Sequence, residues 1–481
     1  MLTLSKRTAG LPRRPVLARH RLFTALIVLA AGLRTATILG YRPGRIYWYD
    51  SYTYLQLALD PRPREELQPS GYPFLLWLLR PFHSIELVIA VQHLLGLGAG
   101  VMIYVLLRRR GLPAWGAALA SVPVLFDGQM LQLEHAVLSD TLFIFLVVAA
   151  IVALMWSPRL SARAGALAGV LLALAALTRT VALPLLALVL LYLALRRAGP
   201  RALAATTTAA LVPLVLYAGW YHAEYGRFRL VGGDGVALWA RTMTFADCKV
   251  IKPPPAEAPL CPNGSWQDAA SEYVWARDSA LNRMPGGWAN DDLARSFAVR
   301  AILTQPLDYL GAVTRDVSLA FHWTPARHPK RVTPAFGFAK GRWGPAGVPA
   351  YALRGLDEYA PGTTGAYHSV EPYSGFLRVY QYPAYLRGPF LAAILLLGAL
   401  GLRRGTLVPW GAAMVLLVLP VAVLDFDHRY VLPAVPFGCL AAALSVHTST
   451  FRVWVRSRTS KVTRPALRPE ASRSSATSAT T

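Results

Sequence analysis

The sequence predicts an all-α membrane protein with about ten membrane-spanning helices and one long outer segment of mixed or irregular structure. The chain of 481 residues is 54% hydrophobic and 15% charged, with a mean hydropathy of +0.39. A soluble domain carries about 25% charged residues. Long apolar runs recur along the chain, and basic residues gather in alternating connecting segments. This composition excludes a water-soluble protein and, apart from the C-terminal tail, a disordered one.

The apolar runs define the expected spans, because a spanning helix needs about 20 predominantly apolar residues. The run at 162–195 is divided at Thr178-Arg179-Thr180, since one helix of that length would measure about 50 Å and exceed the roughly 30 Å hydrocarbon core. The expected spans are, in chain order, 22–40, 87–107, 113–126, 141–156, 162–177, 181–195, 203–220, 386–402, 406–423 and 431–446.

Basic residues set the expected orientation, because Lys and Arg concentrate in short cytoplasmic loops. The segment 1–21 contains several basic residues and no acid. Both termini are therefore expected in the cytoplasm. A cleavable signal peptide is the alternative for this basic start, but the loops alternate correctly only if the first span is retained. The net charge of +24 arises mainly in such segments, so it indicates topology and not nucleic-acid binding. The other basic segments are 108–110, 159–163, 196–201, 403–404 and the tail.

This orientation divides the chain into five parts. They are a basic cytoplasmic arm (1–21), a first part of the membrane core with functional outer loops (22–220), an exoplasmic domain (221–385), a second part of the core (386–446) and a disordered basic cytoplasmic tail (447–481). The exoplasmic segment is long enough for a small domain. It contains Cys248 and Cys261, which we expect to form a disulfide because the exterior is oxidising. Two free thiols are the alternative.

Acidic and basic side chains stand at the outer ends of the expected spans. Singly, each can serve as a helix-end anchor. Together they suit group transfer from a lipid phosphate. A carboxylate can accept the proton of an attacking hydroxyl, and arginines bind phosphate through paired, charge-assisted hydrogen bonds. These residues are Asp50, Glu134, Asp140, Arg179, Asp427 and Arg429.

Five short motifs lie in the expected outer segments or at the adjoining helix ends, and four of them contain one of these residues. They are DSYTYLQLA (50–58), SGYPFLL (70–76), LSDTLF (138–143), LTRT (177–180) and HRYVLPAVP (428–436). The order of these motifs along the chain and their expected position on one side of the membrane resemble those of motifs in the GT-C glycosyltransferases. The resemblance is to the branch of the protein O-mannosyltransferases and the lipid A aminoarabinose transferase. Many relatives carry a second acid directly after the first-loop acid. Here Ser51 follows Asp50, Asp140 stands where Glu is common, and Thr180 replaces Pro.

The resemblance implies an inverting glycosyltransferase that moves a sugar from a polyprenyl-phosphate carrier to an acceptor on the outer face of the plasma membrane. The acceptor is a protein, lipid or polysaccharide, and the other partners are membrane lipids. The implied general base is Asp50, and the implied phosphate ligands are Arg179 and Arg429. The missing second acid argues against a metal, and no cofactor is expected. The composition suggests a bacterial host. The residues expected to orient the sugar or the arginines are Glu134, Asp140 and Asp427.

A transporter or lipid flippase of cell-envelope precursors is the main alternative. Transporters keep ionisable residues near the bilayer midplane on broken helices and often have repeated halves. Here the charges stand at one face and no repeat is found. A membrane-anchored assembly protein is a further alternative, but its partners would bind the long outer segment, whereas the acids gather at short turns.

Overall fold

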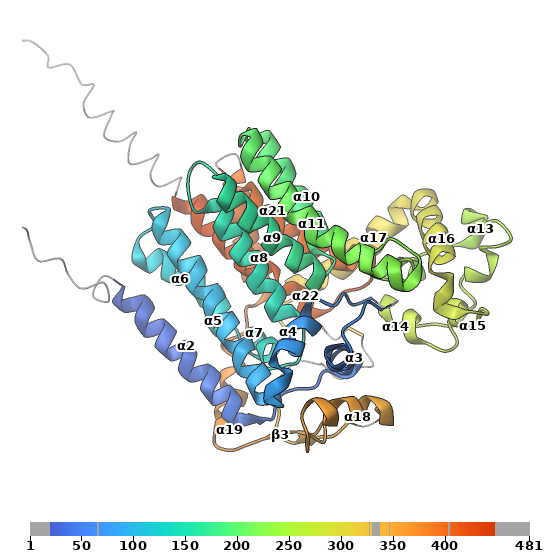
Figure 1. The fold of residues 1–481 in the computed structure, drawn as a ribbon, viewed down its shortest axis with the longest axis horizontal. Helices are drawn as coiled ribbons and strands as arrows, with labels where there is room; N and C mark the ends of the chain where they lie inside the picture. Colours follow the sequence, from blue (N-terminus) through green and yellow to red (C-terminus); the bar gives the residue numbers. More distant parts are fainter. Residues whose placement is uncertain are drawn as a thin grey trace, which may run out of the picture.

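The computed structural model describes residues 20–64, 67–326, 328–329, 337–345, 347–402 and 405–447. The expected basic arm up to residue 19, the pair at 403–404 and the expected disordered tail from residue 448 lie outside the described residues. Most of the described chain is helical, and the apolar helices form one bundle (Figure 1).

Each of the ten expected spans coincides with an apolar helix of the described chain. Within the described residues, four helices are long and apolar enough to cross a membrane, namely α2 (Arg21–Gly40), α5 (Ile85–Arg109), α11 (Pro200–Tyr225) and the helical region His428–His447. That last region begins with α22 (His428–Val431) and continues beyond a turn at 432–433. The other apolar helices have 10–17 residues, so the number of ten spans stays a prediction. They are α6 (Ala114–Phe126), α8 (Asp140–Met155), α9 (Ala162–Thr178), α10 (Ala182–Leu195), α20 (Gly388–Ala399) and α21 (Leu407–Val423).

The two ends of the described chain lie at the same end of the bundle (Figure 1). His20 is 2.6 Å from the hydroxyl of Tyr104, near the end of α5. His447 approaches Gly111, which lies two residues after the end of α5. We call the opposite end of the bundle the site end, because the charged residues predicted from the sequence lie there.

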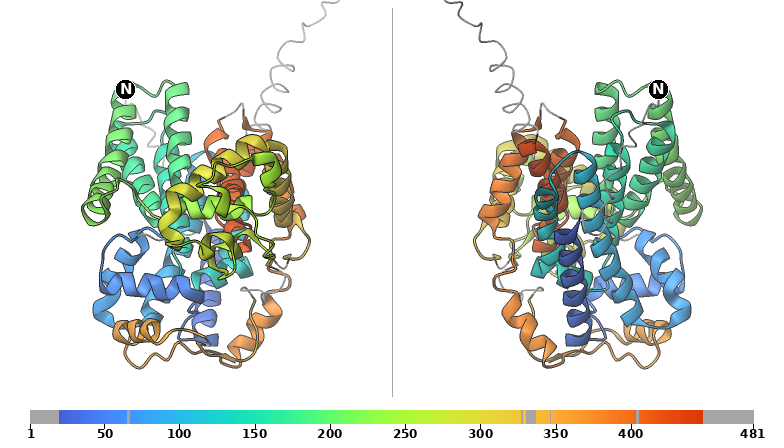
Figure 2. Two further views of the ribbon diagram at one scale, coloured as in Figure 1. Left: turned by 90° about the vertical axis from the view of Figure 1, so that its right-hand side faces the viewer. Right: turned by 90° about the vertical axis from the view of Figure 1, so that its left-hand side faces the viewer.

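The segment between α2 and α5 is largely helical and covers the site end. It contains α3 (Trp48–Leu59), α4 (Gly71–Leu79) and η1 (Arg80–Phe82). Helix α3 runs across the end of the bundle (Figure 2). The chain before α3 is fixed to the chain before α8, because the Arg45 amide donates to the His135 carbonyl (3.0 Å) and the Val137 amide to the Arg45 carbonyl (3.0 Å). This pairing joins α3 to the start of α8, with α7 (Gly128–Glu134) directly before the paired stretch.

The expected exoplasmic segment contains a helical subdomain with its own core. Buried Trp239, Leu260, Leu281 and Phe297 belong to that core, and a disulfide joins Cys248 to Cys261 as the sequence predicts. Its elements are α12 (Asp234–Thr242), α13 (Cys248–Ile251), η2 (Ala258–Leu260), α14 (Ala270–Trp275), α15 (Ala280–Arg283), η3 (Gly287–Asn290) and α16 (Asp291–Thr304).

The rest of that segment returns to the bundle and extends along the site end (Figure 2). A small antiparallel sheet has β3 in its centre, with Tyr41 opposite Ser369 and Arg342 opposite His368. Helix α18 packs on α3, and α19 packs on α2. The elements are α17 (Pro306–Ser318), η4 (Leu319–Phe321), β2 (Arg342–Trp343), α18 (Ala350–Tyr359), β3 (Tyr367–Ser369) and α19 (Tyr373–Tyr380), and β1 (Tyr41–Arg42) completes the sheet.

Candidate active site

Five of the six charged residues predicted from the sequence meet at the site end. For four of them the helix position suits the charge, because carboxylates are favoured at helix N-termini and cations at C-termini. Asp50 lies in the first turn of α3, and Asp140 is the first residue of α8. Arg179 is the C-cap of α9. Asp427 is the N-cap of α22, where its Oδ1 accepts the Arg429 amide (3.0 Å).

Asp50 receives a hydrogen bond on each carboxylate oxygen. Arg429 Nη1 donates to its Oδ2 (2.8 Å), and Gln68 Nε2 donates to its Oδ1 (3.0 Å). The Asp50 side chain is 24% exposed, whereas that of Arg429 is 13% exposed. The carboxylate is therefore oriented by two donors and remains reachable from outside.

Arg429 is shared by two acids and two aromatic rings. Its Nε lies 3.2 Å from Oδ2 of Asp427, so one guanidinium pairs with both Asp427 and Asp50. Its Cζ lies 5.2 Å from the ring centre of Tyr47 and 5.1 Å from that of Tyr430. A guanidinium over a ring face at this distance is attracted by the ring quadrupole. These contacts fix the guanidinium plane.

Arg179 forms the second half of the cluster. Its Nη1 donates to Oδ1 of Asp140, whose side chain is fully buried. Its Cζ lies 5.2 Å from the centre of the same Tyr430 ring. Tyr430 therefore contacts both guanidiniums, and it links the Asp140–Arg179 pair to the Asp50–Arg429 pair.

The cluster combines three carboxylates with two guanidiniums in partly dehydrated surroundings. Burial raises the pKa of the Asp427 carboxyl, and Arg429 beside it acts in the opposite direction. Burial also raises the pKa of the Tyr54 phenol, so this hydroxyl remains neutral. It lies 3.0 Å from the hydroxyl of Ser139. Together, these groups can bind an anion through the arginines and accept a proton at a carboxylate.

The sequence predicts that Glu134 belongs to this group of charged residues, but the structure places its side chain outside the cluster. Its carboxylate accepts two hydrogen bonds from Arg34 of α2 (2.7 and 2.8 Å) and is 2.8 Å from Nδ1 of His93. The Glu134 side chain is only 4% exposed. Gly96 of α5 makes room for it, because a Cβ at this position would collide with the carboxylate. Glu134 therefore orients Arg34 inside the bundle, and Arg179 and Arg429 are held by other acids.

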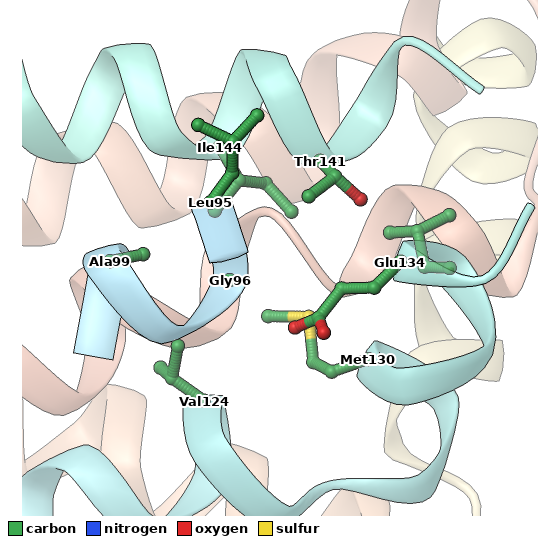
Figure 3. Close-up of a pocket in the computed structure, with 9 residues that line it drawn as sticks. Leu95, Gly96, Ala99, Val124, Met130, Glu134, Thr141 and Ile144 are labelled. Atoms are coloured by element: carbon green, nitrogen blue, oxygen red, sulfur yellow. The ribbon is translucent and has the colours of Figure 1, made fainter. Parts of the chain in front are cut away.

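Figure 3 shows the surroundings of Glu134, whose carboxylate points toward Gly96 and Met130 in a small hollow. The other lining side chains are mostly apolar and include Val124 and Ile144. A buried ion pair needs such close partners, because an unpaired charge in this environment would be strongly destabilising.

Sequence reasoning did not single out Gln68, Tyr47 or Tyr430 as site residues. Tyr430 follows Arg429 directly, and Tyr47 stands in the aromatic stretch before Asp50, so local aromatic enrichment is the available signal for both. No sequence signal marks Gln68, because the fold alone brings it to Asp50. Within the described ranges, no three His, Cys, Asp or Glu side chains form a group that could hold a metal ion.

Comparisons with solved structures give low similarity over long stretches. The S. cerevisiae protein O-mannosyltransferase Pmt1-Pmt2 complex bound to the sugar donor has a TM-score of 0.36 and 15% identity, over 50% of this chain and 37% of that chain. ArnT from Cupriavidus metallidurans bound to undecaprenyl phosphate has a TM-score of 0.38 and 12% identity, over 94% of this chain and 82% of that chain. The oligosaccharyltransferase AglB from Archaeoglobus fulgidus, in complex with an inhibitory peptide and a dolichol-phosphate, has a TM-score of 0.44 and 13% identity, over 95% of this chain and 53% of that chain.

The protein thus spans about a third of the length of the yeast chain and about half of the archaeal one. No curated protein sequence matches it.

A family model gives the informative match. Residues 87–224 match the family described as dolichyl-phosphate-mannose-protein mannosyltransferase. This region runs from the start of α5 to the end of α11 and includes Asp140 and Arg179. The match covers less than a third of the chain, so it shows that this part of the protein is similar to that family of membrane glycosyltransferases.

Proposed function

We propose that the protein transfers one sugar from a polyprenyl-phosphate carrier to an acceptor hydroxyl, with inversion at the sugar carbon, and that the reaction takes place at the site end. The contact between Asp50 and Arg429, joined to Arg179 through Tyr430, carries this proposal. In this arrangement a carboxylate that can accept a proton contacts one cation, Arg429, and Tyr430 links it to a second cation, Arg179. The match to a family that uses a lipid-phosphate sugar supports the same donor class.

The proposed reaction forms one bond and breaks one. Asp50 accepts the proton of the acceptor hydroxyl while the oxygen of that hydroxyl attacks the anomeric carbon of the sugar. The bond from that carbon to the phosphate oxygen breaks, and its electron pair leaves with the polyprenyl phosphate. Arg179 and Arg429 stabilise the phosphate charge through charge-assisted hydrogen bonds.

The pairing of Asp50 with Arg429 suggests how the donor prepares the base. A phosphate that binds Arg429 competes with Asp50 for its Nη1 donor. The carboxylate is then released from this partner and free to accept a proton. Asp140 and Asp427 position the two arginines, through the contacts already described. Glu134 is not part of the proposed site, because it pairs with Arg34 inside the bundle. We further propose metal-independent chemistry and a site on the outer face of a bacterial plasma membrane, with both termini in the cytoplasm.

Asp50→Asn tests the base directly, because it keeps the size of the side chain and removes the proton acceptor. We expect turnover to fall about 10²–10⁴-fold, the usual contribution of general acid–base catalysis. Donor affinity should be maintained or raised, because a neutral amide competes with the phosphate for Arg429 less than a carboxylate does. The assay uses the purified full chain in lipid nanodiscs. A panel of radiolabelled prenyl-phosphate sugars supplies the donor, and a membrane extract supplies the acceptor. The measured quantity is the polyprenyl phosphate that is released.

Asp60→Asn is the matched control, since Asp60 is an exposed acid at the other end of α3. Its turnover should equal that of the wild type. Wild-type turnover by Asp50→Asn would show that another acid is the base. In sealed proteoliposomes, movement of intact lipid-linked sugar across the bilayer without release of polyprenyl phosphate would instead support a flippase.

Arg179→Lys tests the phosphate role while leaving a cation beside the buried Asp140. Lysine lacks the planar fork that matches a phosphate. We expect donor affinity to fall about tenfold, equivalent to about 1.4 kcal/mol, with a smaller change in turnover at saturating donor. Binding of radiolabelled donor at equilibrium checks this. Unchanged affinity would exclude Arg179 as a phosphate ligand.

A further inference from the structure

A stripe of exposed aliphatic side chains occupies the corner between α16 and α17. Leu303 is 74% exposed, Leu307 80% and Leu310 55%, and Val299 on the same side of α16 is 45% exposed. Contiguous exposed apolar surface of this kind marks an interaction with a protein or a membrane. We call these four residues the corner stripe. They belong to the segment expected from the sequence to be exoplasmic.

Two contacts fix the position of α17 relative to the membrane helices. The hydroxyl of Tyr309 donates to the carbonyl of Ala422 (3.0 Å), one residue before α21 ends. Beyond the other end of α17, the amide of Gly388, the first residue of α20, donates to the carbonyl of His322 (3.1 Å). Gly388 leaves no room for a Cβ against the backbone of Phe321. Helix α17 therefore lies at the level where two apolar bundle helices end.

The joint between α16 and α17 holds the corner stripe in place. Gln305 is the C-cap of α16 and the N-cap of α17. Its Nε2 donates to Oδ2 of Asp308 (3.0 Å), and its Oε1 accepts the amide of Asp247 (2.9 Å). The two leucines beside this joint thus project from a fixed corner of the subdomain.

The distribution of residues on α17 is typical of a helix in a membrane interface. Its inner side buries Ala312 and Val313, whereas Leu307 and Leu310 face outward. Arg315 in its last turn is exposed, and a basic side chain there can reach lipid phosphates. The adjacent α20 also exposes large apolar side chains, including Leu396 at 69%. Helix α17 is thus bonded to α21 and, through the chain that follows it, to α20, which itself has exposed apolar side chains.

We propose that the corner stripe inserts into the interfacial layer of the lipid bilayer and anchors the helical subdomain beside α20 and α21. Amphipathic helices with such a face bury it a few ångströms below the headgroups, roughly 5–10 Å. The subdomain then stays at a fixed height next to the site end. This proposal is independent of the transferase reaction, because it concerns only the lipid contact.

Spin labels at single cysteines in nanodiscs of phosphatidylcholine and phosphatidylglycerol test the proposal. The labelled variants are Leu307→Cys and Leu303→Cys in a Cys439→Ala background, which leaves the Cys248–Cys261 disulfide intact. For each spin label, accessibility to molecular oxygen, which is apolar and enters the bilayer, is compared with accessibility to a water-soluble nickel complex. Leu396→Cys on α20 is the lipid control, and Arg277→Cys, at an exposed site after α14, is the water control.

We expect the ratio of oxygen to nickel accessibility at residues 303 and 307 to exceed that at residue 277 severalfold and to approach that at residue 396. A ratio at residues 303 and 307 equal to that at residue 277 would overturn the proposal, because the corner stripe would then face water. Low accessibility to both reagents would overturn it as well, because it would indicate that a protein partner covers the stripe.

Discussion

Tyr430 explains how two arginines can lie together in the candidate site. Two guanidiniums repel each other, but each here faces the ring of Tyr430 at about the same distance, 5.1 and 5.2 Å. Each also has its own acid, Asp140 for Arg179 and Asp427 for Arg429. The ring faces add attraction for both cations. We infer that Tyr430 is a positioning residue for the pair.

Substitutions of Tyr430 separate its ring from its hydroxyl. Tyr430→Phe keeps the ring and loses only the oxygen that accepts from Arg429 Nη2 (3.2 Å), so donor affinity should change little. Tyr430→Leu removes both ring faces, and we expect KM for the donor to rise about tenfold because two cation–π contacts of about 0.5–1 kcal/mol each are lost. Steady-state kinetics at matched protein levels measures both. Equal KM values for the two variants would show that the ring does not position the arginines.

At the scale of elements, the close approach of α9 and α11 sets the position of Arg179. Gly165 and Gly169 lie one turn apart on α9, and a Cβ at Gly169 would collide with the carbonyl of Thr206 on α11. Small residues four apart allow helix backbones to approach closely in membranes. Because Arg179 is the C-cap of α9, this contact also helps to define where the guanidinium lies.

Gly169→Ala should therefore destabilise the protein, because the added methyl group has no room. We expect a loss of about 1–3 kcal/mol, the usual effect of overpacking, measured as a lower Tm in detergent. Gly219→Ala on α11 is the matched control, because nothing lies within 4 Å of a Cβ there and alanine is the better helix former. An equal Tm for Gly169→Ala and the wild type would mean that α9 and α11 can separate without loss.

At the scale of the molecule, Asp425 joins the helical subdomain to the bundle. Its Oδ2 accepts the amide and hydroxyl of Ser271 in α14 (3.1 and 2.7 Å), and its Oδ1 lies 2.8 Å from Nε2 of His328. Burial alone would raise the pKa of Asp425, but the bonds from His328 and Ser271 lower it overall. Burial alone would lower the pKa of His328, but Asp425, with Asp316 and Asp268, raises it overall.

These shifts predict a pH window of stability. The raised pKa of His328 gives a contribution that is complete below about pH 6.5, its unfolded value, and is lost as pH rises through the higher folded value. The lowered pKa of Asp425 gives a contribution that is complete above about pH 4 and is lost as pH falls through the lower folded value. The Tm of the wild type should therefore fall by a few degrees as the pH rises from about 6 to 8. His328→Gln should lack this fall, and an identical pH profile in both proteins would contradict the assignment.

The sequence by itself determined the helical membrane architecture. Apolar length and the breaks at charged residues are local properties of the chain, so each expected span coincides with a described helix and Arg179 stands at the predicted turn. The disulfide between Cys248 and Cys261 was also predictable from two cysteines close together in one expected outer segment. Local composition likewise singled out Asp50 and Arg429, because charges are rare beside apolar runs.

Only the tertiary structure decided which charges meet. Glu134 and Asp140 are only six residues apart, yet Glu134 pairs with Arg34 and Asp140 with Arg179. Gln68 and Arg429 reach the two oxygens of Asp50 from opposite parts of the chain. Ion pairs depend on separations of a few ångströms, and these are fixed by contacts such as Gly96 against Glu134. Apolar periodicity determines which face of a helix is buried, but not which residue of another helix lies against it.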